Sequence, residues 1–188
     1  FSPSVREAGD VSAGVFNAEG RMLAQAVTGT PGHVNSMAAS VRHFLDVFPA
    51  KGMKEGDVYI TNDPWKGTGH LHDITMVTPA FHKGRIVALF AATSHVVDIG
   101  GLGLSPESRQ IYHEGIHIPI MPLVEAGRMN EWLVALVRQN VREPIQVEGD
   151  IYALVACNER GCQRLSAMMD EYGLDDLEEL GATIIAQS

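Results

Sequence analysis

The sequence predicts an α+β fold in which N-terminal β-hairpins and an amphipathic helix precede a mixed sheet and a helical C-terminal part. Three observations support this prediction. Short apolar runs alternate with glycine-containing turns through the first 128 residues, apolar residues recur at helical spacing between 35 and 48, and this spacing returns beyond 129. We therefore expect a β-rich region at 1–128 that holds the functional site, and a helical segment of the same domain at 129–188.

The first expected elements are a hairpin and a helix. Residues 12–17 and 21–26 flank a turn in which Gly20 can supply a positive φ. A turn-rich stretch at 28–32 separates this hairpin from a helix expected at 35–48. The apolar face of that helix would carry Met37, Val41, Phe44, Leu45 and Phe48.

The next expected elements are strands. A short apolar run at 58–61 indicates one strand and leads into a glycine-rich loop. Two longer strand-like runs, 73–80 and 85–93, follow in sequence, and Gly84 is the natural turn residue between them. These two runs therefore predict a central hairpin.

The length of that turn sets which residues of the central hairpin face each other. A three-residue turn at 83–85 would place Asp73 opposite His95. A two-residue turn would place Asp73 opposite Ser94. It would also place His72 opposite His95. In either register, the ends of the two strands bring these polar residues together.

The C-terminal part is predicted to be helical. Apolar residues recur near the helical period over 130–140 and again over 147–169. A last helix is expected at 174–187, where acidic residues in the first turns interact favourably with the helix dipole.

A repeated His-x-x-Asp pattern, His70 to Asp73 and His95 to Asp98, is the most informative feature of the chain. Imidazole nitrogens and carboxylate oxygens suit a first-row divalent metal, and both copies lie beside predicted strand ends. We therefore predict a metal site built from these residues. The absence of thiolate ligands disfavours a structural zinc cage and favours Mn, Fe, Co or a catalytic Zn with an open position.

Two further histidines, His33 and His72, belong to the region of the expected site. His72 is ambiguous, because its role depends on the register of the central hairpin. It replaces a ligand if it pairs with His95, and otherwise it supports the ligands from behind or acts as a base. A serine nucleophile formed by Ser94, His95 and Asp98 is disfavoured, because adjacent strand residues point to opposite faces.

Net charge, hydropathy and glycine spacing argue against several classes of function. The net charge of −9 provides no basic surface for nucleic acid. No apolar run approaches the roughly 20 residues of a membrane span, and the first residues lack the pattern of a signal peptide, so we expect a cytoplasmic protein. The glycines at 100–103 do not have the spacing of a phosphate-binding loop, so ATP binding is not expected in this chain.

Several motifs in order closely resemble the hydantoinase B family. They are Asp10–Arg21, Pro31–Met37, Gly56–Pro64, His70–Ile74 and His95–Gly101, with Gly115–Pro119 and Asn140–Arg142 continuing the series. This resemblance covers nearly the whole chain. It implies that the chain is well under half of a family member.

The resemblance also implies a site and a partner. It places the metal ligands on His70, Asp73 and His95, with Asp98 as a fourth ligand or a supporting carboxylate. His72, which stands where the family more commonly has Pro, and Asp98 are the candidate proton carriers. The resemblance further implies a small-molecule substrate and a partner subunit of hydantoinase A type that binds ATP.

Three functions follow from these expectations. The first is a B-type subunit of an ATP-dependent enzyme that hydrolyses a cyclic amide such as a hydantoin or 5-oxoproline. The second is the equivalent subunit of an ATP-dependent ketone carboxylase of the acetone or acetophenone type. The third is a non-catalytic assembly module, in which the His and Asp side chains only stabilise turns and strand ends.

Overall fold

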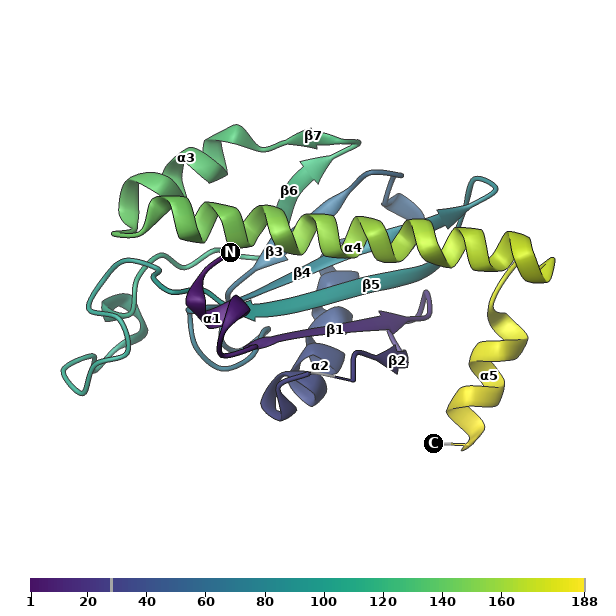
Figure 1. Ribbon diagram of the computed structural model, residues 1–188, viewed down its shortest axis with the longest axis horizontal. Coiled ribbons are helices and arrows are strands. Elements are labelled where there is room, and N and C mark those ends of the chain that lie inside the picture. The colour runs from purple at the N-terminus through teal and green to yellow at the C-terminus, as the bar shows by residue number, and fades with distance from the viewer. Residues whose placement is uncertain (28, 188) are drawn as a thin grey trace.

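The computed structural model describes residues 1–27 and 29–187, and it confirms the α+β fold class. One seven-stranded sheet has the order β2-β1-β5-β4-β3-β6-β7 (Figure 1). All of its described strand pairs are antiparallel, so the expected mixed sheet is replaced by an antiparallel one. The elements are α1 (Pro3–Arg6), β1 (Val11–Phe16), β2 (Met22–Gln25), α2 (Pro31–Val47), β3 (Val58–Thr61), β4 (Asp73–His82), β5 (Arg85–His95), β6 (Met121–Glu125), β7 (Arg128–Met129), α3 (Glu131–Asn140), α4 (Pro144–Tyr172) and α5 (Glu178–Gln187), with short 3-10 turns at Ala50–Gly52 and Ile111–His113.

Helices cover both faces of the sheet. The long helix α4 crosses one face, and α2 lies behind the other (Figure 1). Successive side chains of a strand point to opposite faces, so Met76 of β4 joins the hydrophobic cluster on the α4 side and Val77 joins the cluster on the α2 side. Because both faces are packed, β3 and β4 are buried along nearly their whole length.

The central hairpin combines features of both expected registers. Its turn has two residues, since His82 pairs with Arg85, and both turn residues have positive φ, 48° and 77°. Asp73 nevertheless pairs with His95, because one extra residue, Val87, forms a β-bulge in β5. The bulge thus produces at the far end of the hairpin the pairing that a three-residue turn would have given.

Helix α2 begins at Pro31, four residues before the expected start at 35. Proline is tolerated in the first helical turn, where its missing N–H has no partner to lose. Pro31 and Gly32 therefore belong to the helix and not to the expected turn, of which Thr28 lies outside the described residues. The earlier start places His33 in the first turn of α2.

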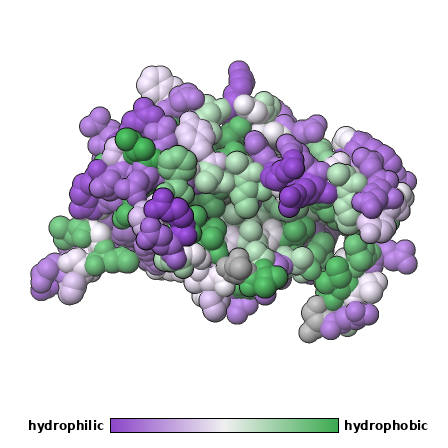
Figure 2. Space-filling view, in the orientation of Figure 1, coloured by the Kyte–Doolittle hydropathy of each residue, from purple (hydrophilic) through white to green (hydrophobic). Residues whose placement is uncertain are grey.

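Large apolar side chains remain exposed in the helical part. Those with the largest exposed fractions in α3 and α4 are Trp132 (88%), Ile145 (77%) and Tyr172 (69%). Figure 2 shows hydrophobic residues among hydrophilic ones on the face that α4 crosses. Among the described residues, no helix is long and apolar enough to cross a membrane.

A long connection between β5 and β6 extends beyond the end of the sheet (Figure 1). Its two ends are held together where the Ile116 N–H donates to the Ile99 carbonyl, at 2.9 Å. Gly115 permits this approach, because it has a φ of 143° and a Cβ at that position would lie 2.1 Å from the Ile99 oxygen. The contact therefore holds the returning part of the loop against its first part, close to the end of β5.

We expect Gly115→Ala to lower the free energy of unfolding by at least about 2 kcal/mol, because the added methyl collides with backbone that cannot move independently. Gly127→Ala is the matched control. Gly127 also has a positive φ, 80°, but a Cβ there meets no atom within 4 Å, so only the backbone strain of about 1 kcal/mol remains. Denaturant unfolding of both variants measures the difference, and equal losses would contradict the steric argument.

Candidate metal centre

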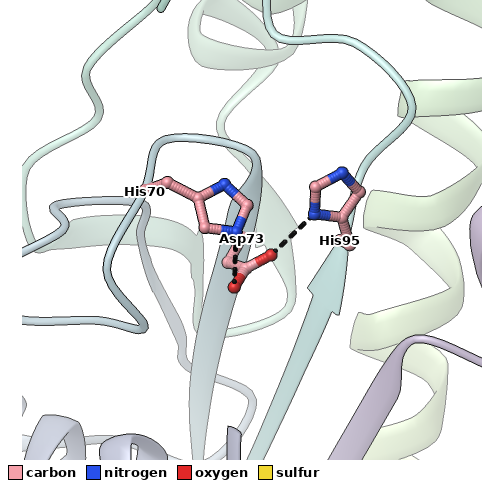
Figure 3. Close-up of side chains that lie close together, drawn as sticks. All are labelled: His70, Asp73 and His95. Atoms are coloured by element: carbon pink, nitrogen blue, oxygen red, sulfur yellow. Dashed lines mark hydrogen bonds and ion pairs between the residues drawn. The ribbon is translucent and has the colours of Figure 1, made fainter. Parts of the chain in front are cut away.

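The ends of β4 and β5 bring three predicted ligands together. Asp73 is the first residue of β4, His95 is the last residue of β5, and the two are directly paired. His70 comes from the loop that leads into β4, and its ring points to the same carboxylate (Figure 3). One potential ligand atom from each of these residues lies within 4.8 Å of the others.

The Asp73 carboxylate is the centre of this cluster and is only 2% exposed. Its Oδ1 lies 3.0 Å from Nδ1 of His95, and its Oδ2 lies 3.2 Å from Nε2 of His70. Two further groups contact Oδ2, namely Oγ1 of Thr68 at 2.5 Å and Nε2 of His33 at 3.2 Å. Donors from the loop, α2 and β5 therefore converge on one buried carboxylate.

These contacts determine the charges in the cluster. Burial alone raises the pKa of Asp73, but the hydrogen bonds from its four neighbours together lower that pKa far below its usual value. The hydrogen bond to Asp73 raises the pKa of His70 above that of an ordinary histidine, against the opposing effect of burial. The cluster thus holds a negative charge on Asp73 at neutral pH and favours a positive charge beside it.

His72 lies against the cluster without contacting the carboxylate. Its ring stacks on that of His95 with centroids 5.3 Å apart and planes 13° apart, and it is 4% exposed. Burial lowers the pKa of His72, and the neighbouring His95 and His70 lower it further. At neutral pH His72 is therefore an uncharged imidazole, and its Nδ1 has no hydrogen-bond partner.

The Asp98 carboxylate is not part of the cluster formed by His70, Asp73 and His95. Its carboxylate accepts hydrogen bonds from the backbone N–H and the guanidinium of Arg142, and from the Gly100 N–H. Burial raises the pKa of Asp98, but the bonds from Arg142 and Gly100 outweigh it and leave the pKa lowered. These contacts favour a structural role, in which Asp98 ties the loop after β5 to the segment between α3 and α4.

The donor set of the cluster fits a divalent cation. Two imidazoles and one anionic carboxylate are ligands typical of Mn, Fe or a catalytic Zn, and no thiolate is near to bias the site towards a structural zinc. His70 Nδ1 is buried without a hydrogen-bond partner, so the ring has a nitrogen atom that the protein does not use and that could coordinate a cation. A bound cation would replace the protons that the imidazoles now share with Asp73.

The sequence singles out His70, Asp73 and His95, which the structure brings together, but it does not indicate the other groups that contact Asp73. Thr68 lies in a glycine-rich loop and gave no chemical signal. The sequence places His33 in the site region but indicates no role for it, and nothing in the sequence points to Asp10, which lies 3.5 Å from Nε2 of His33. The only local signal was the Pro-Gly pair before His33, which marks a helix start when read with Pro in the first turn.

Comparison with known proteins establishes the family. All of residues 1–188 match the family described as Hydantoinase B/oxoprolinase. The chain therefore belongs to this family, as the ordered motifs predicted. A 5-oxoprolinase of Dictyostelium discoideum is 33% identical over 93% of this chain, which spans 14% of that protein.

A second relative has a solved structure. Caprolactamase subunit beta of Pseudomonas jessenii is 32% identical over 78% of this chain, which spans 26% of it. The crystal structure of the ATP-dependent caprolactamase matches 93% of this chain and 30% of the solved chain with a TM-score of 0.83 and 29% identity. A nucleotide-free acetone carboxylase shares the fold, with a TM-score of 0.83 at 21% identity over 96% of this chain and 24% of its own.

We expect Asp98→Asn to lower the melting temperature by several degrees at pH 7. The lowered pKa means that the Asp98 carboxylate contributes stability above its unfolded-state pKa of 3.8 and loses that contribution as the pH falls through the folded-state pKa. The difference between variant and parent should therefore shrink below about pH 4.

Asp175→Asn is the control for that experiment, because Asp175 pairs with Lys83 at an exposed position. Exposed ion pairs contribute little, so its melting temperature should stay close to that of the parent. Thermal unfolding between pH 3 and 7 tests both variants. A loss at Asp98 that is independent of pH would show that the ion pair is not its cause.

Proposed function

We propose that this chain supplies the metal centre of an ATP-dependent enzyme that opens a cyclic amide. The observation that carries the proposal is the buried cluster of His70, Asp73 and His95 in a chain of the hydantoinase B/oxoprolinase family. The named relatives that act on lactams, a 5-oxoprolinase and a caprolactamase, support this substrate class.

The three ligands would hold a divalent Mn, Fe or Zn ion, which supplies Lewis-acid polarisation of a substrate oxygen. Asp73 fixes the charge of the site, because its lowered pKa keeps it anionic at neutral pH. His70 contacts Oδ2 of that carboxylate and His95 contacts Oδ1, and the centroids of the two rings lie 5.0 Å apart. The protein thus presents nitrogen and oxygen donors at one end of the hairpin, where the His70 and His95 side chains are 29% and 21% exposed and a substrate could approach.

We assign proton transfer to His72 rather than to Asp98. His72 is uncharged and has an unused ring nitrogen beside the ligands. Asp98 is held by Arg142, so its oxygens are already committed. A neutral imidazole next to the reacting centre can accept a proton from a water or an amide and return it to the leaving nitrogen.

The energy for ring opening would come from ATP on a partner of hydantoinase A type, because this chain has no phosphate-binding motif of the known kinds. The solved caprolactamase is an ATP-dependent enzyme, and the sequence of the caprolactamase beta subunit resembles this chain. The requirement for ATP also favours a cytoplasmic location.

The test is reconstitution of the full-length polypeptide and its partner from metal-free protein. We expect ATP-dependent opening of 5-oxoproline, caprolactam or hydantoin to return with Mn²⁺, Fe²⁺ or Zn²⁺. His95→Ala should lower activity by at least about 100-fold and reduce the metal content, because one of three ligands is lost. His43→Ala, at an exposed position of α2, is the control and should retain both.

The same assay separates the alternatives. Consumption of bicarbonate with acetone or acetophenone, without opening of any cyclic amide, would replace hydrolysis by ketone carboxylation. Full activity in a strong chelator would exclude the metal centre. Metal-free protein that assembles with its partner but never gains activity or metal would indicate an assembly module.

A further inference from the structure

We propose that His33 is a positioning residue of the metal centre, which orients the Asp73 carboxylate from the opposite layer of the fold. This inference rests on the proposed metal centre. Three observations support it, namely the contact of His33 with Asp73, its burial, and its contact with Asp10 just before β1.

The contact is direct and buried. Nε2 of His33 lies 3.2 Å from Oδ2 of Asp73, and the His33 side chain is 7% exposed. Among the described residues, the set of ligand atoms that lie within 4.8 Å of one another contains His70, Asp73 and His95 but not His33. His33 therefore contacts the carboxylate from outside this set, so its effect on a bound cation would pass through Asp73.

Helix α2 holds His33 in place through its N-terminal end. Thr30, the N-cap residue, donates from Oγ1 to Oδ1 of Asp10 at 2.8 Å, and its N–H donates to Oγ of Ser12 at 2.9 Å. The same Oδ1 of Asp10 lies 3.5 Å from Nε2 of His33. The ring is thus next to Asp10, the residue that precedes β1, as well as being held by its own helix.

Asp10 also connects His33 to the ligand on β5. Its carbonyl accepts a hydrogen bond from the backbone N–H of His95 at 3.1 Å. A single residue therefore contacts the side chain of His33 and the backbone of His95. This arrangement sets the distance between the helix that orients the carboxylate and the strand that delivers a ligand.

The two oxygens of the Asp73 carboxylate have different contacts, and this difference supports the same role. Among the described residues, Oδ1 is contacted by the side chain of His95 alone. Oδ2 is contacted by the side chains of Thr68, His70 and His33. An ionised carboxylate has about four lone-pair directions, so donors outside the ligand set can fix its rotation and leave others for a cation. The first turn of α2 adds a favourable helix dipole, because its N-terminal end lies next to this negative charge.

The experiment is a titration of Mn²⁺ into the metal-free full-length polypeptide, followed by electron paramagnetic resonance of free and bound ion. We expect His33→Ala to weaken Mn²⁺ binding by about 10- to 100-fold. His33→Gln should recover most of the affinity, because its amide nitrogen reaches nearly as far as Nε2. His33→Asn should not, because its amide is one methylene shorter and ends near the position of Nδ1.

His82→Ala is the matched control. His82 is 3% exposed and lies at the opposite end of β4, where its Nδ1 bonds with Oγ of Ser166 at 2.9 Å. Its loss should leave Mn²⁺ affinity unchanged even if it lowers the melting temperature. The Gln and Asn variants decide the question if the alanine variant does not fold, since both keep a polar side chain.

The outcomes are separable. Parent-like affinity in His33→Ala, or equal affinity in the Gln and Asn variants, would overturn the positioning role and leave the metal centre intact. If the parent binds no Mn²⁺, or if His95→Ala binds it as well as the parent, the proposed centre itself is wrong. Equal loss of affinity in His33→Ala and His82→Ala would indicate a general effect of removing a buried histidine.

Discussion

The buried charge of Asp73 is the interaction on which the rest of the site depends. An ionised carboxylate taken out of water is unfavourable unless other groups replace its hydration. Here the replacement comes from segments that are distant in sequence, since His33 lies on α2, Thr68 in a loop and His95 on β5. The two layers of the fold are therefore held together at the site by the same contacts that keep its charge.

The register of the central hairpin is the second constraint. In a strand, a shift of one residue moves every side chain to the other face of the sheet. The bulge at Val87 corrects the register of a two-residue turn so that Asp73 faces His95. Without this extra residue Asp73 would face Ser94, and His95 would point away from the carboxylate.

Membership of the hydantoinase B/oxoprolinase family places these observations within larger proteins. The chain spans 14% of the 5-oxoprolinase and 26% of the caprolactamase subunit that it resembles. Exposed side chains such as Trp132 and Ile145 in the helical part are of the kind that meet another protein surface. The fold is shared with an acetone carboxylase, so the fold alone does not select the reaction, and the chemistry must be read from the site.

Local patterns in the sequence determined most elements of the fold and the three candidate ligands. Hydrophobic periodicity depends on neighbouring residues, so it located the first hairpin, the central strands and the C-terminal helices. Turn chemistry indicated that the two His-x-x-Asp motifs meet at one end of the central hairpin. Tertiary structure alone decided the bulge, the two-sided burial of the sheet and the start of α2. It also decided the partners of Asp73 and Asp98, because contacts such as those of His33 with Asp73 and of Arg142 with Asp98 join residues 40 and 44 positions apart. No local pattern encodes such contacts, since they form only when separate layers pack.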